Sequence, residues 1–382
     1  MLKSNVWNKK TMISHQEYMH LALAQARLAW GIAKPNPAVG CVLVREGQIV
    51  GQGHTQEIGG PHAEVMAIRA AGVHAQGATA YVTLEPCSHI GRTPPCSQGL
   101  IDAGITQVVY GCQDPNPQVA GQGIQQLLAA GVEVVGPVLQ EQCQAVNAGF
   151  MHYMSTNRPY VFSKLACSLD GRTAMASGQS QWITGPEARA RVHLMRAQSC
   201  ALVTGIGSIL ADDPSMTCRA PELVTSGVPE ALIGRVKQPL RVVIDSRLNS
   251  PQNAKIFQQD GPVLLLTCVQ DKQLHAPFVA LGAEVIVVPD QQGKADLAAV
   301  IDCLAQRGCQ QIMLEAGAGL NASFLQAGLL QRLEVFMAPK ILGASGRPLL
   351  QHNIERLEDA WQLAFSQVES IGDDLLLSLR LS

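Results

Sequence analysis

The sequence predicts an α/β protein built from two domains. Short apolar segments typical of buried strands alternate with helical segments along most of the chain. This alternation is typical of mostly parallel sheets covered by helices on both faces. A length of 382 residues allows two or three domains. The polar stretch at residues 155–159 separates two such runs, so we expect one domain at residues 1–155 and another at 156–382.

The first run is predicted to begin after a loose leader at residues 1–13. Ser14 and Glu17 form a capping box that opens the first helix, and a hairpin with its turn at Glu46-Gly47 follows. The expected strands are at residues 38–44, 49–53, 78–84, 107–110 and 132–135, and the later helices begin after His62 and at residues 96, 124 and 141, the last being a linker to 154.

The second run continues the alternation and then changes character. Its tail is predicted to form antiparallel strands that close a mixed sheet, at residues 333–339, 364–369 and 375–381. Before the tail, we expect strands at residues 160–166, 201–204, 241–245, 263–268, 284–288 and 311–315, and helices at 186–197 and 296–306.

Residues 62–96 carry the strongest chemical pattern. His62-Ala63-Glu64 opens a helix, and Cys87 and Cys96 follow after a strand. Two thiolates and an imidazole suit Zn²⁺ and leave a fourth position for water, while Glu64 is free to move protons. Both cysteines are expected near helix N-termini, which favour thiolates. The set predicts a hydrolytic zinc site of the nucleobase-deaminase type.

Other interpretations of these residues are weaker. A buried cysteine is usually a small apolar residue, and among 11 cysteines two could lie near a histidine by chance. His89, between the two cysteines, is a competing ligand. A purely structural zinc would normally have four protein ligands and would leave Glu64 without a role.

Composition and charge narrow the class of partners. The formal net charge is −2 and no basic stripe is present, which argues against a nucleic-acid partner. No signal peptide is evident, and no apolar run approaches a membrane span. The odd cysteine count and irregular spacing favour a reducing compartment. We expect a cytoplasmic protein with a small-molecule substrate and no membrane partner, assembled as a homo-oligomer, either dimer or tetramer.

The residues around the two cysteines also carry a family resemblance. Residues 83–89 are Thr-Leu-Glu-Pro-Cys-Ser-His and residues 91–96 are Gly-Arg-Thr-Pro-Pro-Cys. With His62-Ala63-Glu64, they resemble the deaminase domain of the bifunctional riboflavin-biosynthesis deaminase/reductase family. The resemblance implies a cytidine-deaminase-like three-layer domain, zinc on His62, Cys87 and Cys96, and Glu64 as the proton shuttle.

The same resemblance implies that Asn36 and Arg92 contact the substrate. Asn36 lies in a Pro-Asn-Pro turn, and Arg92 is equally compatible with an ordinary solvated arginine. The family also has a histidine seven residues before the zinc histidine. That position is Thr55 here, so either His54 serves instead or this contact is lost.

The second domain has a glycine-rich turn between a strand and a helix, near Gly317. Glycines there let backbone amides reach a pyrophosphate, although the turn lies too late for a standard Rossmann unit. Residues 164–174, 180–184, 210–214 and 243–246 resemble the riboflavin reductase domain, which is similar to dihydrofolate reductase and uses NADPH. The NADPH contacts implied are Ala166, Trp182, Ser208, Asp212, Ser246, Gly317, Ala318, Gly319, Leu320 and Asn321. The substrate contacts implied are Ser180, Arg196, Arg219 and Glu315.

Two features of these residues add chemistry to the resemblance. Arg196 and Arg219 form the clamp expected for a sugar phosphate, because guanidinium presents a bidentate fork. Ser246 and Arg247 follow a strand where a 2′-phosphate could bind, while Asp245 could instead favour the 2′-hydroxyl of NADH. The family and Arg247 together favour NADPH.

The resemblance thus implies two successive reactions. The first domain would deaminate 2,5-diamino-6-ribosylamino-4(3H)-pyrimidinone 5′-phosphate with zinc. The second would reduce the ribosyl group of 5-amino-6-(5-phosphoribosylamino)uracil to ribityl with NADPH. The alternative is a nucleoside or tRNA deaminase with an unrelated appended domain. The eight-residue spacer between Cys87 and Cys96 and the absence of a basic surface argue against this alternative.

Overall fold

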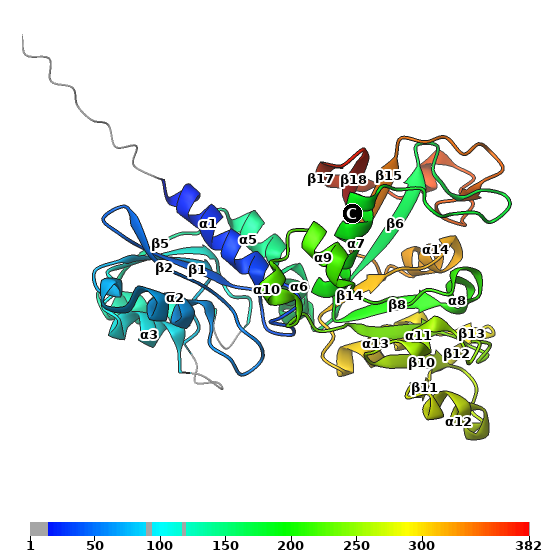
Figure 1. The fold of residues 1–382 in the computed structure, drawn as a ribbon, viewed down its shortest axis with the longest axis horizontal. Helices are drawn as coiled ribbons and strands as arrows, with labels where there is room; N and C mark the ends of the chain where they lie inside the picture. Colours follow the sequence, from blue (N-terminus) through cyan, green and yellow to red (C-terminus); the bar gives the residue numbers. More distant parts are fainter. Residues whose placement is uncertain (1–13, 89–93, 117–119, 382) are drawn as a thin grey trace, which may run out of the picture. The chain divides into compact units, whose positions relative to one another are not determined.

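The computed structural model describes residues 14–88, 94–116 and 120–381, and these form two compact units (Figure 1). The units divide between Asn147 and Ala148. The expected linker helix is two helices rather than one, α5 (Gln140–Val146) and α6 (Ala148–Thr156). The second of these packs on strands β6 (Tyr160–Ser168) and β14 (Gln311–Leu314) of the second unit.

The first unit is a five-stranded sheet with helices on both faces (Figure 1). Its strand order is β2-β1-β3-β4-β5, in which β1 pairs antiparallel with β2 and β3 while β3, β4 and β5 are parallel. The elements are α1 His15–Leu28, β1 Gly40–Arg45, β2 Gln48–His54, α2 Ala63–Ala71, β3 Thr79–Leu84, α3 Cys96–Asp102, β4 Gln107–Cys112, α4 Gln122–Ala129, β5 Glu133–Val135 and α5.

Glycines let the helices of this unit approach the sheet closely. A Cβ on Gly40 would lie 1.9 Å from the Ala22 oxygen of α1, and one on Gly53 would lie 2.5 Å from the Ala63 oxygen of α2. Because these two glycines face opposite sides, α1 and α2 cover opposite faces of the sheet. The predicted capping box of Ser14 and Glu17 is present at the start of α1.

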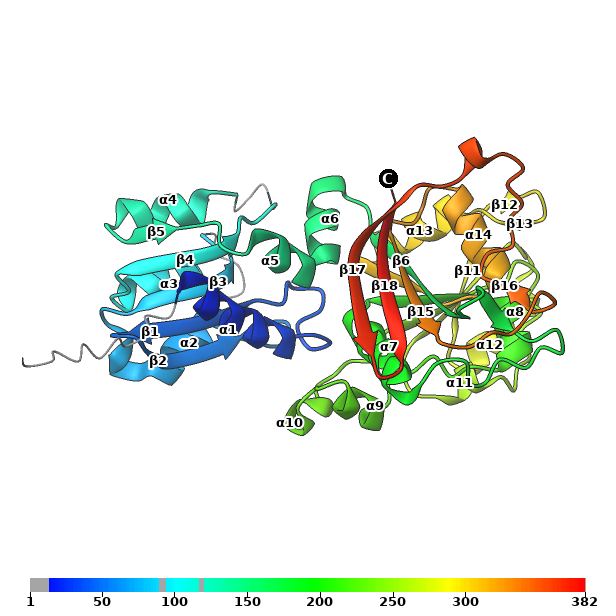
Figure 2. The same cartoon turned by 90° about the horizontal axis from the view of Figure 1, so that it is seen from above.

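The second unit contains a mixed sheet of nine strands (Figure 2). Its order is β11-β10-β9-β8-β14-β6-β15-β18-β17. Neighbours from β11 to β15 are parallel, and β15, β18 and β17 are antiparallel, as the tail pattern predicted. The strands are β6 Tyr160–Ser168, β7 Arg172–Ala174, β8 Ala201–Gly205, β9 Leu240–Ile244, β10 Val263–Thr267, β11 Glu284–Val287, β12 Asp290–Gln291, β13 Lys294–Ala295, β14 Gln311–Leu314, β15 Arg332–Ala338, β16 Arg347–Pro348, β17 Leu363–Ile371 and β18 Asp374–Leu381.

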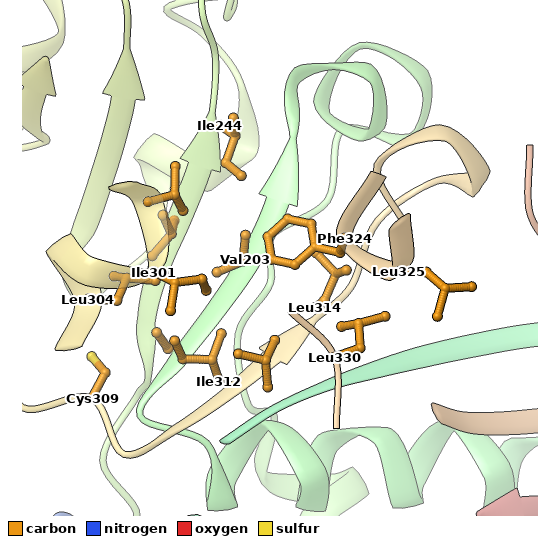
Figure 3. Packing of buried hydrophobic residues seen from close by; sticks show 14 of the residues in the cluster. Val203, Ile244, Ile301, Leu304, Cys309, Ile312, Leu314, Phe324, Leu325 and Leu330 are labelled. Carbon is orange, nitrogen blue, oxygen red and sulfur yellow. The ribbon is translucent and has the colours of Figure 1, made fainter. Parts of the chain in front are cut away.

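Each face of this sheet has its own apolar core. Figure 3 shows one of them, where Val203 and Leu314 of the strands meet Phe324. Phe324 is fully buried, which is worth about 1.5–3 kcal/mol relative to an exposed side chain. The opposite face is covered by α7, α8 and α12. The helices of the unit are α6, α7 Pro186–Gln198, α8 Ile206–Asp212, α9 Ala220–Thr225, α10 Glu230–Ile233, α11 Lys255–Gln258, α12 Lys272–Ala280, α13 Leu297–Gln306 and α14 Ala318–Gln326.

Across the described parts of the chain, every helix is too short or too polar to cross a membrane.

Candidate active sites

The first site is a cluster of His62, Cys87 and Cys96. His62 is the N-cap of α2, Cys87 follows the C-terminal end of β3, and Cys96 is the first residue of α3. His62 Nδ1 lies 3.7 Å from Cys87 Sγ and 3.2 Å from Cys96 Sγ. The backbone N–H of Cys96 donates to Cys87 Sγ at 3.4 Å. The fold therefore brings together the three residues that the sequence analysis selected.

This donor set fits a zinc ion. Zinc–ligand bonds of about 2.0–2.3 Å in a tetrahedron place neighbouring ligand atoms roughly 3.5–3.8 Å apart. The three ligand atoms lie within 4.8 Å of one another, with the individual distances close to that range. Within the described residues, this is the single group of three or more His, Cys, Asp or Glu side chains with metal-binding spacing.

The electrostatics of the cluster favour a thiolate. The Cys96 thiol, together with His62, lowers the pKa of Cys87 to about 4 against the opposing effect of burial. The hydrogen bond with Cys87, followed by burial, raises the pKa of Cys96. Glu64 is 4% exposed, and burial followed by the charge of Cys87 raises its pKa to about 7.

Glu85 anchors the turn that carries Cys87, a role that the sequence analysis missed. Its carboxylate is 3% exposed and accepts four backbone N–H groups, those of Asp114, Gly121, Gly123 and Ile124. These contacts fix the start of α4 against the end of β3. A glutamate between a buried strand and Pro-Cys was the signal available in the sequence.

The predicted substrate loop near Asn36 is fixed by hydrogen bonds to the backbone that follows it, at Ala38 and Val39. Asn36 is exposed, and the Asn147 amide pairs with both the N–H and the carbonyl of Ala38. Thr55 Oγ1 bonds to the backbone of Val39. Arg92 and His89 lie outside the described residues.

His54 faces away from the metal cluster. It is the cross-strand partner of Gly40, and partners across an antiparallel pair share a face of the sheet. Since Gly40 faces α1 and the metal histidine begins α2, which covers the other face, His54 is poorly placed to replace the family histidine at position 55.

The second site lies at the carboxyl ends of parallel strands, where ligands of open α/β sheets bind. The glycine turns after β8 and β14 are neighbours there, because a Cβ on Gly205 would lie 3.0 Å from Leu320 Cδ2. The expected NADPH residues at this edge are Ala166, Ser208, Asp212, Ser246, Gly317, Ala318 and Gly319.

Three expected NADPH residues differ in their surroundings. Asn321 is fully buried and donates to the carbonyls of Ala316 and Gly317, so its side chain holds the glycine turn. Ser246 Oγ accepts the N–H of Ala295 and ties the turn after β9 to the β12–β13 hairpin. Trp182 is 61% exposed, with the Arg189 guanidinium 4.6 Å from its ring centre.

Asp245 is engaged within its own loop. Its carboxylate accepts the N–H groups of Asn249 and Ser250 and the Ser250 hydroxyl, and the residue is fully buried. The complete burial of Asp245 argues against the interpretation in which it binds the 2′-hydroxyl of NADH.

Glu315 forms the anionic centre of the expected substrate site. It receives Nε and Nη2 of Arg196 at 2.9 and 2.8 Å, and Lys164 Nζ lies 3.6 Å away. Burial alone would raise the pKa of Glu315, but Arg196 and Lys164 outweigh it and hold the pKa at about 2. Arg196 Nη1 donates to the Thr217 carbonyl, so three of its five N–H groups serve the protein. Lys164 was missed as a site residue.

The other expected substrate residues are more open. Ser180 is half-buried in the loop between β7 and α7. Arg219 is the N-cap of α9 and its side chain is 56% exposed. Its guanidinium contacts Glu222 Oε1 at 2.7 Å and the imidazole of the buried His193, another residue that the sequence analysis did not select.

Comparisons with known proteins identify both units. A family model described as the cytidine and deoxycytidylate deaminase zinc-binding region matches residues 12–112, and one described as the RibD C-terminal domain matches residues 159–377. The riboflavin biosynthesis protein RibD of Escherichia coli (strain K12) is 44% identical over 363 residues, covering 95% of this chain and 98% of that protein. RibD of Haemophilus influenzae is 43% identical over 364 residues, covering 94% and 96%.

Two solved structures match the whole fold. Acinetobacter baumannii RibD has a TM-score of 0.84 at 39% identity, covering 96% of this chain and 99% of that one. A diaminohydroxyphosphoribosylaminopyrimidine deaminase/5-amino-6-(5-phosphoribosylamino)uracil reductase from Thermotoga maritima has a TM-score of 0.81 at 30% identity, with the same coverage.

The fold and the sites define a bifunctional enzyme, with a deaminase unit of the cytidine-deaminase type and a reductase unit. The chain belongs to the RibD family of riboflavin biosynthesis proteins. It functions in that biosynthesis as a deaminase and reductase with Zn²⁺ and NADPH as cofactors. The predicted fold class, family and cofactors are confirmed, and the family is favoured over a nucleoside or tRNA deaminase with an unrelated domain.

Proposed function

We propose that the first unit deaminates 2,5-diamino-6-ribosylamino-4(3H)-pyrimidinone 5′-phosphate and the second reduces the ribosyl group of the product to ribityl. The observation that carries this proposal is the presence, in one chain, of a three-residue metal cluster beside a buried glutamate and of an anionic centre flanked by cations. The substrates are those printed in the name of the Thermotoga maritima relative.

In the deaminase, His62, Cys87 and Cys96 hold the metal. Zinc, when bound, supplies the Lewis acidity that activates a water molecule. Glu64 takes a proton from that water and delivers it to the amine that leaves the pyrimidine as ammonia. Asn36, on the loop that Asn147 fixes, contacts the pyrimidine. Arg92 contributes the further substrate contact that the family implies.

In the reductase, NADPH supplies the hydride when bound at the glycine turns. Trp182, Ser208, Asp212, Ser246 and the residues after Gly317 position it. Lys164 and Arg196 keep Glu315 ionised, so its carboxylate accepts hydrogen bonds from substrate donors. Ser180 and Arg219 complete the substrate contacts. Arg219, with its exposed fork, binds the phosphate, and Arg196 has two N–H groups left for the same ligand.

We propose that the two functional domains are residues 1–155 and 156–382 and that the enzyme works in the cytoplasm without a nucleic-acid partner. A net charge of −2 supports the absence of a nucleic-acid partner, and eleven cysteines without a disulfide support the compartment. We also propose a homo-oligomer, a dimer or tetramer. Strand β17 supports it, because it is the edge of the nine-stranded sheet and exposes Phe365 and Val368 at 64% and 58%. Sedimentation of the parent and Phe365→Lys would test that assembly.

The decisive experiment supplies the full-length zinc enzyme with the pyrimidinone ribosyl phosphate. Ammonia release and subsequent NADPH oxidation should both occur, while cytidine under the same conditions should release little ammonia. Efficient cytidine deamination without NADPH oxidation would overturn the proposal. A protein that binds zinc but releases no ammonia from either compound would overturn the deaminase half.

A further inference from the structure

A single imidazole contacts Arg219 at both ends. His193 lies in α7 and is 4% exposed. Its Nδ1 lies 3.2 Å from the backbone nitrogen of Arg219. Its Nε2 lies 3.3 Å from Nε and 3.0 Å from Nη2 of the same residue. A neutral imidazole has one acceptor nitrogen, so only one of these two contacts can be a hydrogen bond from Arg219 to the ring.

This contact requires a neutral ring with the right tautomer. A neutral imidazole has one acceptor nitrogen, and an imidazolium has none. The guanidinium is bound when Nε2 is the acceptor and the proton is on Nδ1. Burial, then the charges of Arg196 and Arg219, lower the pKa of His193 to about 3, so the ring is neutral near pH 7.

The guanidinium has a second partner, which contacts the same nitrogen as His193 Nε2. Glu222 is three residues away on α9 and contacts Nη2 of Arg219 at 2.7 Å. The Arg219 side chain of this pair is 56% exposed and that of Glu222 24%, and ion pairs near the surface contribute about 0–1 kcal/mol. Arg196 cannot compensate fully, because Glu315 and Thr217 take three of its donors. The orientation of Arg219 therefore depends on the imidazole together with Glu222.

We propose that His193 is a positioning residue of the reductase, which orients the Arg219 guanidinium toward the substrate phosphate through Nε2. The inference rests on the proposed role of Arg219 as the phosphate ligand. His193 itself touches neither substrate nor cofactor. It lowers the cost of binding by presenting the fork already ordered.

The test is reductase kinetics of the full-length enzyme on 5-amino-6-(5-phosphoribosylamino)uracil and on its dephosphorylated counterpart. His193→Leu, which has no acceptor, should raise KM for the phosphorylated compound about tenfold, as expected for a weakened charge-assisted bond, with kcat and KM for NADPH nearly unchanged. The dephosphorylated compound should not distinguish this variant from the parent. His193→Gln, whose amide oxygen can replace Nε2, should recover most of the affinity.

Arg219→Ala tests the phosphate contact separately from the positioning role of His193. It should raise KM for the phosphorylated compound, and adding His193→Leu should cost nothing further. If Arg219→Ala raises KM but His193→Leu does not, the positioning role is overturned and the phosphate role stands. If Arg219→Ala itself has no effect, the proposed phosphate contact fails and the inference fails with it.

A matched pair guards against misfolding. His193→Asn keeps an acceptor near Nδ1 but not near Nε2, so it should behave like His193→Leu, whereas His193→Gln should not. Deaminase activity and thermal unfolding of the same preparations report whether the chain is folded. Equal KM for the Asn and Gln variants would overturn the proposal.

Discussion

Glu315 and Arg196 form a bidentate ion pair, with Nε–Oε2 and Nη2–Oε1 distances of 2.9 and 2.8 Å. Both side chains are less than a fifth exposed. Breaking a pair of this kind by neutralising one partner leaves an uncompensated buried charge, which costs about 3–5 kcal/mol. The pair therefore contributes to the stability of the reductase as well as to its site.

Glu315→Gln should destabilise the second unit by about 3 kcal/mol. For a unit of this size, that is a fall of about 6–12 °C in Tm, measured by scanning calorimetry. The matched control is Glu369→Gln, which removes the same charge from the more exposed pair with Arg191 and should lower Tm by at most about 4 °C. Equal shifts for the two variants would contradict the ranking by burial.

Glu64→Gln should abolish deamination and leave reduction intact. The amide keeps the size of the side chain but cannot accept the proton, and general acid–base catalysis is typically worth about 10²–10⁴-fold. Zinc should stay bound, because Glu64 is not a ligand. The checks are ammonia release, metal analysis, and NADPH oxidation with the already deaminated ribosyl intermediate. Retained deamination would show that Glu64 is not the proton shuttle.

Cys96→Ser should lose the zinc. A serine hydroxyl is a poor substitute for a thiolate in a site with only three protein ligands. Cys112→Ser is the matched control, since Cys112 is equally buried and uses its sulfur to donate to the Thr83 carbonyl, a bond that serine can also form. Metal analysis of both dialysed variants decides the matter, and stoichiometric zinc in Cys96→Ser would refute the ligand set.

Arg247→Ala should weaken NADPH binding selectively. Arg247 is exposed in the turn after β9 and reaches the β12–β13 hairpin near Gly293, where a 2′-phosphate could be bound. We expect KM for NADPH to rise about tenfold, the scale of one charge-assisted hydrogen bond, and KM for NADH to stay constant. Arg158→Ala, which lies just before the amino-terminal end of β6 and so away from the carboxyl ends of the strands, should change neither. A parallel loss for both cofactors would argue against a 2′-phosphate contact.

The free energy of unfolding of the second unit should fall as the pH is lowered, because His193 binds a proton when the unit unfolds. Its folded pKa of about 3 lies below the ordinary 6.5 because of burial and of Arg196 and Arg219, with Glu315 opposing them. Between these values the unfolded chain binds a proton that the folded chain does not. The contribution of the neutral His193 to the free energy of unfolding is therefore complete above pH 6.5 and is lost as the pH falls toward 3.

Urea titrations at pH 7.5, 6.5 and 5 would measure this contribution. The parent should lose about 2 kcal/mol between pH 6.5 and 5 in excess of His193→Gln, even though the variant starts less stable. If the free energy of unfolding changed equally with pH in the two proteins, the pKa of His193 would be the same in the folded and unfolded states.

The sequence was sufficient to predict those parts of the fold that local pattern determines. The hairpin, the parallel strands and the antiparallel tail all follow from apolar alternation. The linker helix was expected to be continuous, but it breaks at Asn147, whose side chain serves Ala38 more than a hundred residues away. Helix α12 was missed, and it contains Pro277 in its interior, which sequence rules treat as a helix breaker.

In the sites, too, features set by local sequence could be predicted and features set by distant partners could not. His62, Cys87 and Cys96 were identifiable because ligand chemistry restricts the residue types and their spacing. Lys164 and His193 were not, because their roles come from partners distant in sequence, at Glu315 and Arg219. For Asp245 the sequence left two interpretations open, because its burial and its bonds to Asn249 and Ser250 depend on the folded loop.

The position of β6 has a consequence for how the chain is made. All five strands of the first sheet leave the ribosome within the first 147 residues, so that unit can fold early. Strand β6 emerges next, but both its neighbours, β14 and β15, are about 150 residues downstream. At cellular rates of synthesis this strand waits roughly 10–30 s for its partners. During that time its two unpaired edges are exposed, so the nascent reductase should be the stage of biogenesis most dependent on chaperones.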